Sequence, residues 1–230
     1  MDPHAPLTDI FRPFLVPGPL LDSLHPDIVG LAEQHARHAA SEREAAVSLY
    51  YAIRDGYRYD PYCVNLDQDH MRASNFMKRN KGYCIEKANL LAAAARAMGI
   101  PARLGFGDVV NHIGTEKLAQ WLGTDRMVFH GYTELYLEGR WVKATPAFNR
   151  ELCEKIGVAP LEFDGVHDSL FQPYEPGGEQ FMTYVMDRGT YAEWPVEEFE
   201  AALRKYYPHL FFANPSGAPV WKLPGSEDEA

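Results

Sequence analysis

The chain has 230 residues, of which 46% are hydrophobic and 23% are charged, and its formal net charge is −10. This length and composition predict one globular domain spanning residues 1–230. The acidic balance and the lack of a Lys/Arg-rich stretch argue against a nucleic-acid partner, and no apolar run is long enough to span a membrane.

The cysteines are three in number and widely spaced: Cys63, Cys84 and Cys153. This usage favours a reducing compartment over a disulfide framework, with an oxidised Cys63–Cys153 pair as the alternative. Residues 1–4 lack the basic and apolar regions of a secretory signal. We therefore expect a cytoplasmic protein.

The first part of the chain combines a proline-rich segment with two predicted helices. Six prolines among residues 1–26 predict an extended surface arm, with one short strand around residues 11–16. A helix is expected to begin near Pro26. Another follows Ser41, whose side chain is expected to cap it together with Glu44, and ends near Gly56. Residues 57–75 are expected to be irregular.

The middle of the chain predicts a helix followed by strands. The helix begins at or near Cys84, is rich in alanine and leucine, and ends at Gly99, before Pro101. A strand is expected over residues 102–106, and a hairpin joins strands at 129–137 and 140–144 through the turn Glu138-Gly139. Residues 107–127 fit no single pattern.

The last third of the chain is less regular. We expect a short helix over residues 152–156, a loop at residues 173–178 and a helix over residues 195–206. Residues 225–230 are expected to be disordered.

The candidate catalytic pair is Cys84 and His130, which is 46 residues later. A cysteine at a helix start lies where the helix dipole favours thiolate and where free N–H groups can hold an oxyanion. Gly82 is expected to allow close approach of a substrate to the loop. His130, at the start of a predicted strand, can serve as the base, and its second ring nitrogen then needs an acceptor, which we expect on the return strand.

These segments resemble the transglutaminase-like superfamily. The nucleophile helix matches through GYC at residues 82–84 and GIPAR at 99–103, and the histidine and return strands through HGYTELYL at 130–137 and GRWV at 139–142. Upstream, IRDGYRY at 53–59 is similar to the segment that precedes the nucleophile. The resemblance covers residues 41–149. It implies a papain-like α+β fold, in which the nucleophile helix packs on an antiparallel sheet.

The resemblance also implies site residues. Cys84 would be the nucleophile and His130 the base of a Cys-His-Asp triad that needs no metal or organic cofactor. The aspartate that family members carry before a proline on the return strand is replaced here by Thr145. Thr145 is therefore the expected third member, with Asn149 and Asp164 as alternatives.

A side-chain oxyanion donor is expected just before Cys84. Asn75, Asn80 and Lys81 are the candidates, and the sequence does not choose among them.

The predicted function is thiol-dependent cleavage or transfer at an amide or thioester bond of a peptide or small-molecule substrate. Thr145 at the aspartate place motivates an alternative, a binding or scaffold module without turnover. A thiol-sensing protein is a third hypothesis, disfavoured because no Cys-x-x-Cys pair is present. No pattern in the sequence indicates an oligomeric state.

Overall fold

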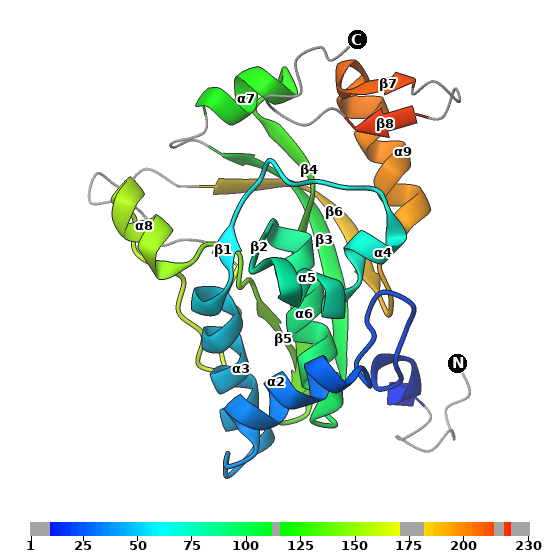
Figure 1. Cartoon of the computed structure of the whole chain (residues 1–230). Coiled ribbons are helices and arrows are strands. Elements are labelled where there is room, and N and C mark those ends of the chain that lie inside the picture. The colour runs from blue at the N-terminus through cyan, green and yellow to red at the C-terminus, as the bar shows by residue number, and fades with distance from the viewer. Residues whose placement is uncertain (1–9, 112–115, 171–181, 214–218, 222–230) are drawn as a thin grey trace.

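The fold is built on a four-stranded antiparallel sheet in the order β5-β4-β3-β6 (Figure 1). The computed structural model describes residues 10–111, 116–170, 182–213 and 219–221. The strands are β3 (Ala102–Asn111), β4 (Arg126–Leu137), β5 (Arg140–Ala144) and β6 (Met182–Tyr191). The predicted α+β class, with a helix packed on an antiparallel sheet, is confirmed.

Helix α6 (Cys84–Ala97) lies against β3 and β4, and α2 (Pro26–Ala36), α3 (Glu42–Gly56) and α5 (Ala73–Arg79) pack on it in turn (Figure 1). Every residue from Cys84 to Arg96 is buried. The sequence predicted an apolar stripe, but α6 is enclosed on all sides. A helix in that position cannot move without disturbing the whole core, so it holds Cys84 in a fixed position.

The helices that precede α6 begin and end close to their predicted boundaries. The Ser41 side chain accepts a hydrogen bond from the Glu44 N–H (3.1 Å), as expected for the cap of α3, and the Glu44 carboxylate accepts from the Ala40 N–H (2.6 Å). The segment expected to be irregular is more ordered than predicted. It contains β1 (Arg58–Tyr59), α4 (Gln68–Met71) and the start of α5, and β1 pairs in parallel with β2 (Lys81–Gly82).

The proline-rich segment is not an extended arm. Residues 12–14 form a 3-10 helix, η1 (Arg12–Phe14), where a strand was expected, and Leu20 and Leu21 are buried in the core. The Asn89 side chain donates to the Leu20 carbonyl (3.0 Å), and this contact ties the segment to α6. The part of the predicted arm before residue 10 lies outside the described residues.

The hairpin between β4 and β5 forms as predicted. Its turn residues Glu138 and Gly139 both have positive φ angles, 49° and 87°, as a tight two-residue hairpin requires. β3 and β4 extend beyond their predicted ranges, into the region that fitted no pattern. Helix α7 (Glu116–Leu122) comes between these two strands in the chain.

In the described C-terminal part, strand β6 and two shorter strands were not predicted: β7 (Phe211–Ala213) and β8 (Pro219–Trp221). The helices there are α8 (Arg150–Ile156), α9 (Val196–Tyr206) and η2 (Pro208–Leu210). The helices expected at 152–156 and 195–206 are therefore present. The loop expected at 173–178 and the disorder expected at 225–230 fall outside the described residues.

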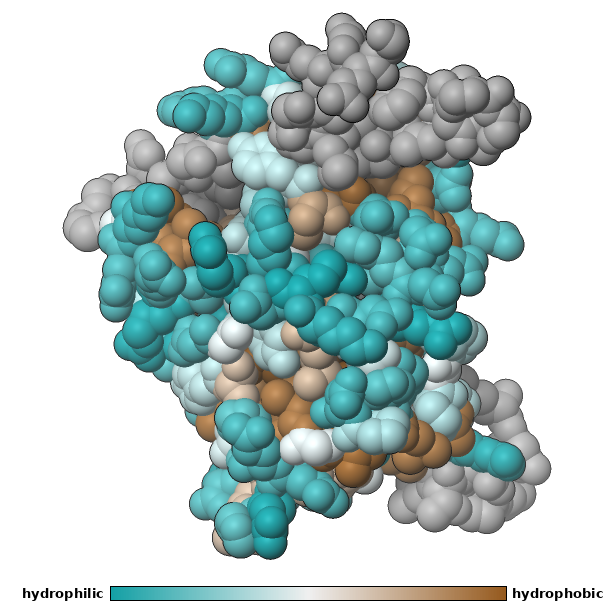
Figure 2. Space-filling model, viewed as in Figure 1, coloured by the Kyte–Doolittle hydropathy of each residue, from teal (hydrophilic) through white to brown (hydrophobic). Residues whose placement is uncertain are grey.

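The face shown in Figure 2 is mainly hydrophilic, with smaller apolar areas between polar ones. Among the described helices, none is both long enough and apolar enough to cross a membrane.

Candidate active site

Cys84 is the first residue of α6, and the turn before it is held by the β1–β2 pair. The Asp60 N–H donates to the Gly82 carbonyl (2.8 Å), and Tyr83 is extended before the helix begins. Gly82 is buried, and a side chain there would overlap the Phe76 ring and the Glu86 carboxylate. The expectation that Gly82 opens the loop to substrate is therefore wrong, since the glycine is needed for internal packing.

Glu86 fixes the residue that precedes Cys84. Its buried carboxylate accepts from the Tyr83 N–H (3.3 Å) and is paired with Arg79. Burial raises the pKa of Glu86 to about 7, against the opposing effect of Arg79. This interaction is the capping contact that sets where α6 begins.

The Cys84 thiol is almost fully buried, with 8% of the residue exposed. Burial raises its pKa to about 11, although hydrogen bonds from the backbone N–H groups of Gly131, Ile85 and Cys84 itself act to lower it. Desolvation therefore outweighs the helix start. The stable form at neutral pH is the thiol, which is the opposite of the direction expected from the sequence.

His130 follows an irregularity in β4. Gly107 lies opposite His130 and Val109 lies opposite Met127, so Asp108 alone faces the two residues Val128 and Phe129. This is a β-bulge. Phe129 has a φ of 58°, a conformation that is a genuine outlier for a bulky side chain.

A buried carboxylate supports that bulge. Asp108 accepts a hydrogen bond from the Phe129 N–H (3.1 Å) and forms ion pairs with Arg126 (2.6 Å) and Arg188. These bonds hold the pKa of Asp108 below its usual value despite burial. The network joins β3, β4 and β6 at the residue immediately before His130.

Cys84 and His130 line the same hollow, which is partly open to solvent. The contact between their elements is direct. A side-chain carbon on Gly131, the residue after His130, would lie 3.0 Å from the Cα atom of Ile85, the residue after Cys84. Gly131 thus allows β4 to approach the start of α6 closely.

His130 and Thr145 line a second, much smaller cavity, with room for about one water molecule. The Nε2 atom of His130 and the Oγ1 atom of Thr145 are both buried, without a hydrogen-bond partner among the described residues. Burial lowers the pKa of His130 to about 4, and no neighbouring charge offsets it. The imidazole is therefore neutral at neutral pH.

The model of the transglutaminase-like superfamily matches residues 29–146, which is 118 of the 230 residues. The chain belongs to this superfamily. Comparison with curated proteins found no match.

Several solved structures resemble this transglutaminase-like chain at low identity. A proposed cysteine protease from Cytophaga hutchinsonii is 17% identical, with a TM-score of 0.49, over 82% of this chain and 56% of that one. The periplasmic domain of TgpA from Pseudomonas aeruginosa is 18% identical, with a TM-score of 0.40, over 59% of this chain and 46% of that one. A proposed protease from Parabacteroides distasonis is 16% identical, with a TM-score of 0.40, over 55% of this chain and 24% of that one. The chain spans between about a quarter and just over half of the length of these structures.

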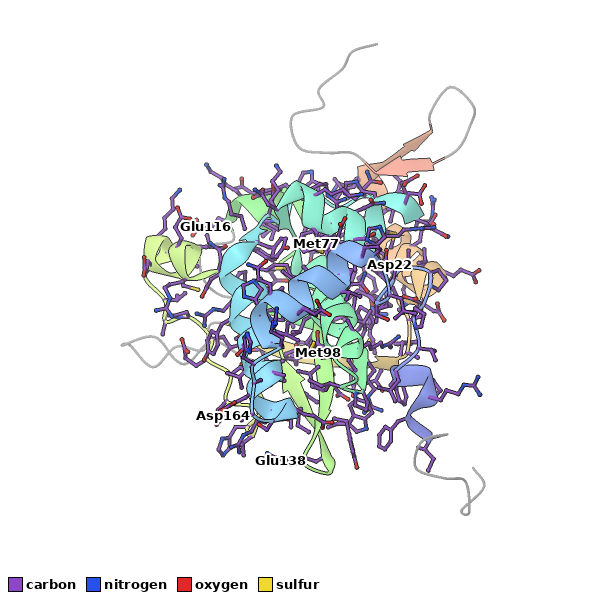
Figure 3. The ribbon with its side chains drawn as sticks, turned by 60° about the horizontal axis from the view of Figure 1, so that its bottom comes forward. Asp22, Met77, Met98, Glu116, Glu138 and Asp164 are labelled. Carbon is purple, nitrogen blue, oxygen red and sulfur yellow. The ribbon has the colours of Figure 1, made fainter. Side chains whose placement is uncertain are left out.

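The two alternatives to Thr145 are engaged elsewhere in this transglutaminase-like fold. Asn149 accepts a hydrogen bond from the Tyr59 N–H (3.0 Å) through its side-chain oxygen. Asp164 is exposed and binds His167 (2.7 Å), which holds the pKa of Asp164 well below its usual value. Figure 3 places Asp164 at the periphery of the molecule, toward the end marked by Glu138. Of the three candidates, Thr145 is the one that shares a cavity with His130.

The side chains proposed as oxyanion donors do not line the Cys84 hollow. Asn75 donates to the Asp69 carbonyl (2.7 Å), Lys81 reaches Asp60 (3.3 Å), and Asn80 is exposed at the end of α5. All three expectations are therefore unsupported by their positions.

Tyr59 and Tyr184 lie beside the pair and were missed by sequence reasoning. The pKa of each phenol is raised, first by burial and then, among other groups, by Cys84. Tyr59 is the pairing partner of Gly82 in the β1–β2 ladder, and the Tyr184 ring lies 6.1 Å from the His130 ring. The motif IRDGYRY contained Tyr59, but only the parallel ladder shows that it reaches the nucleophile.

The other cysteines are free, so the Cys63–Cys153 disulfide is not formed. Cys63 donates to the Asp60 carbonyl (3.1 Å), and burial raises the pKa of its thiol. Within the described ranges, no group of three His, Cys, Asp or Glu side chains could hold a metal ion.

Proposed function

We propose that this protein is a thiol-dependent acyl-transfer enzyme that acts at an amide or thioester bond of a peptide or small molecule. The observation that carries the proposal is the shared hollow. It joins a cysteine at the first position of a long buried helix to a histidine on the adjoining strand. A nucleophile and a base on two rigid elements are the parts that covalent acyl transfer needs.

The proposed reaction has two halves. His130 takes the proton of the Cys84 thiol, the sulfur attacks the carbonyl carbon, and His130 gives the proton to the leaving amine or thiol as the bond to it breaks. Water or an amine then attacks the acyl-enzyme, with His130 as the base. The product is a free acid or a new amide.

The oxyanion of each tetrahedral intermediate needs donors near the sulfur. The N–H groups of Cys84, Ile85 and Gly131 interact with that sulfur, so they are suited to this role. We assign the side-chain donor to Tyr59, because it pairs with Gly82 in the β1–β2 ladder and lines the hollow together with Cys84.

The resting pair in this proposal is neutral. Burial raises the pKa of Cys84 and lowers that of His130, so proton transfer accompanies attack rather than preceding it. Attack by Cys84 in such a site therefore depends more strongly on His130 than it would in a site that holds a preformed thiolate–imidazolium pair.

A scaffold module without turnover is the second candidate. It is favoured by one observation, that His130 has no charged partner where superfamily members are expected to carry an aspartate.

Acylation of Cys84 by aryl esters and thioesters, followed by mass spectrometry of the cysteine peptides, separates the two candidates. We expect acylation at Cys84 at pH 7, slowed by about a hundredfold or more in His130→Ala, the range for loss of a general base. Cys63→Ser is the matched control and should leave the rate unchanged. Tyr59→Phe should slow acylation while leaving alkylation by iodoacetamide unchanged, because alkylation forms no oxyanion.

The scaffold candidate predicts a different result. Cys84 would then be acylated no faster than Cys63, or at a rate that does not depend on His130.

We also propose a reducing compartment, the cytoplasm, as the location. Three free cysteines support it, and cell fractionation with thiol-trapping of the cysteines tests it.

A further inference from the structure

We propose that the hollow beside Cys84 binds an uncharged, apolar acyl group, aromatic or branched aliphatic, of the substrate. This inference rests on the proposed function and specifies its substrate class. Cys84 is part of the wall of this hollow, so a group bound there lies next to the sulfur.

The wall of the hollow is mainly apolar. It is formed by side chains from the loop after β1, from α7, from β4 and from α9: Val64, Leu118, Trp121, Leu122, Met127 and Leu203. Among the described residues that line it, none is an aspartate, glutamate, lysine or arginine, and His130 is held neutral by burial. A charged group that enters would lose its hydration without meeting a counter-charge.

The tyrosines among the described lining residues are Tyr59, which is the oxyanion donor proposed above, Tyr83 and Tyr207, and none of them carries a charge. Tyr207 accepts from the Val128 N–H (2.8 Å) and donates to the Arg126 carbonyl (2.8 Å), so its hydroxyl is already used. The Tyr83 hydroxyl is buried without a partner in the described part of the chain. It can form one hydrogen bond with a bound group, but it carries no charge.

The charge of the whole protein acts in the same direction against anions. A net charge of −10 repels an anionic substrate as it approaches. An acyl group with a carboxylate is therefore disfavoured twice, by the field outside and by the wall inside.

A matched ester series tests the inference on the intact chain. The probes are p-nitrophenyl esters of 4-methylphenylacetic, 4-carboxyphenylacetic, 4-(aminomethyl)phenylacetic and acetic acids. Each rate of Cys84 acylation is divided by the rate of the same ester with a free small thiol, which removes intrinsic reactivity. We expect the 4-methylphenylacetyl probe to react at least about tenfold faster than either charged probe and than the acetyl probe. A tenfold difference is the scale on which an apolar pocket discriminates between substrates.

Two lysine variants place the preference in this hollow. Val64 is half-buried on the wall, and Val64→Lys should raise the rate of the 4-carboxyphenylacetyl probe and reduce that of the 4-methylphenylacetyl probe. Leu66 is two residues away, similarly exposed and absent from the wall, so Leu66→Lys is the matched control and should leave the preference unchanged.

The outcomes distinguish the two levels of the proposal. Equal normalised rates for the methyl and carboxylate probes, or equal effects of the two lysine variants, overturn the apolar pocket and leave the acyl-transfer function standing. Absence of acylation of Cys84 by every probe, including acetyl, overturns the function and this inference with it.

Discussion

Thr145 explains why the candidate base carries no charge. In this structure the residue shares a cavity with His130, and neither its hydroxyl nor the imidazole Nε2 has a hydrogen-bond partner among the described residues. A hydroxyl can orient a ring, but it cannot offset the cost of burying an imidazolium. The pKa of His130 therefore falls to about 4 through burial alone.

Restoring a carboxylate at this position should reverse that effect. In Thr145→Asp we expect the pKa of His130 to rise by about 1–3 units, as for an opposite charge within a few ångströms. The charge should also favour the thiolate–imidazolium form, so alkylation of Cys84 at pH 6–7 should become about tenfold faster or more. Rates of iodoacetamide alkylation against pH measure this.

Thr145→Val is the control, since it has nearly the same shape and no charge, and its profile should stay near that of the parent. If Thr145→Asp leaves the profile unchanged, then Thr145 does not face His130 and its assignment is wrong.

At the scale of elements, one buried lysine connects α6 to the segments around it. The Lys87 side chain is fully buried and donates to the carbonyls of Arg54 (2.8 Å), Tyr57 (2.7 Å) and Ala147 (2.7 Å). Ala147 lies two residues after Thr145, and Lys87 three residues after Cys84. These hydrogen bonds therefore fix α6 relative to the segment that follows β5, close to Thr145.

Replacing Lys87 should lower the free energy of unfolding and should also remove a dependence of that free energy on pH. Burial lowers the pKa of Lys87 from 10.5 to about 7. Between these values the unfolded chain binds more protons than the folded one, so the free energy of unfolding should rise with pH. Lys87→Met should lose that rise and should destabilise the protein by about 3 kcal/mol, because buried carbonyls lose their donor.

Urea unfolding at several pH values between 7 and 9 measures both effects. The window ends at 9 because the raised pKa of Cys84 acts in the opposite direction above it. Lys78→Met, an exposed lysine on α5, is the control and should change neither quantity. A pH dependence that survives in Lys87→Met would mean that another group causes it.

At the scale of the molecule, the core extends beyond the segment that defines the superfamily. The matched residues are 29–146, yet Leu21 is fully buried, β6 completes the sheet beside β3, and α9 packs on β4. Phe199 of α9 contacts Phe129 of the bulge, with ring centroids 5.7 Å apart. The flanking segments are therefore structural parts of the site.

A pair of leucines tests this conclusion. Leu21→Ala should lower the free energy of unfolding by about 2–5 kcal/mol, the usual cost of a cavity in a packed core. Leu24→Ala, three residues later, should change it by less than about 0.5 kcal/mol, because Leu24 is 70% exposed. Urea denaturation of the two variants provides the comparison, and equal effects would show that the N-terminal segment is only peripheral.

Sequence reasoning worked where local signals agree with the fold. The alanine- and leucine-rich run after Cys84 has high helix propensity, and the Glu138-Gly139 turn has the residues a tight hairpin needs, so both elements were predictable. The bulge at Phe129 was not, because it depends on Asp108 and two arginines that are distant in sequence. Strand β6 was missed because Gly189, with a φ of 85°, and two register shifts break its alternation.

The prediction for the proline-rich segment was wrong for a related reason. Composition predicted an exposed arm, but carbonyl groups of that segment are bound by Asn89 and Arg96 of α6. Asn75, Asn80 and Lys81 are near Cys84 in the chain, but none of them lines its hollow, so nearness in sequence was not enough to predict a donor.

The enclosure of Cys84 also determines how long the nucleophile survives. Peroxide and similar oxidants attack the thiolate, and susceptibility follows thiolate character and exposure. Cys84, which is 8% exposed as a residue and has its thiol pKa raised to about 11, offers little of either at neutral pH. The burial that keeps Cys84 in the thiol form therefore also protects it, so we expect this cysteine to resist oxidative conditions that would modify an open, ionised cysteine.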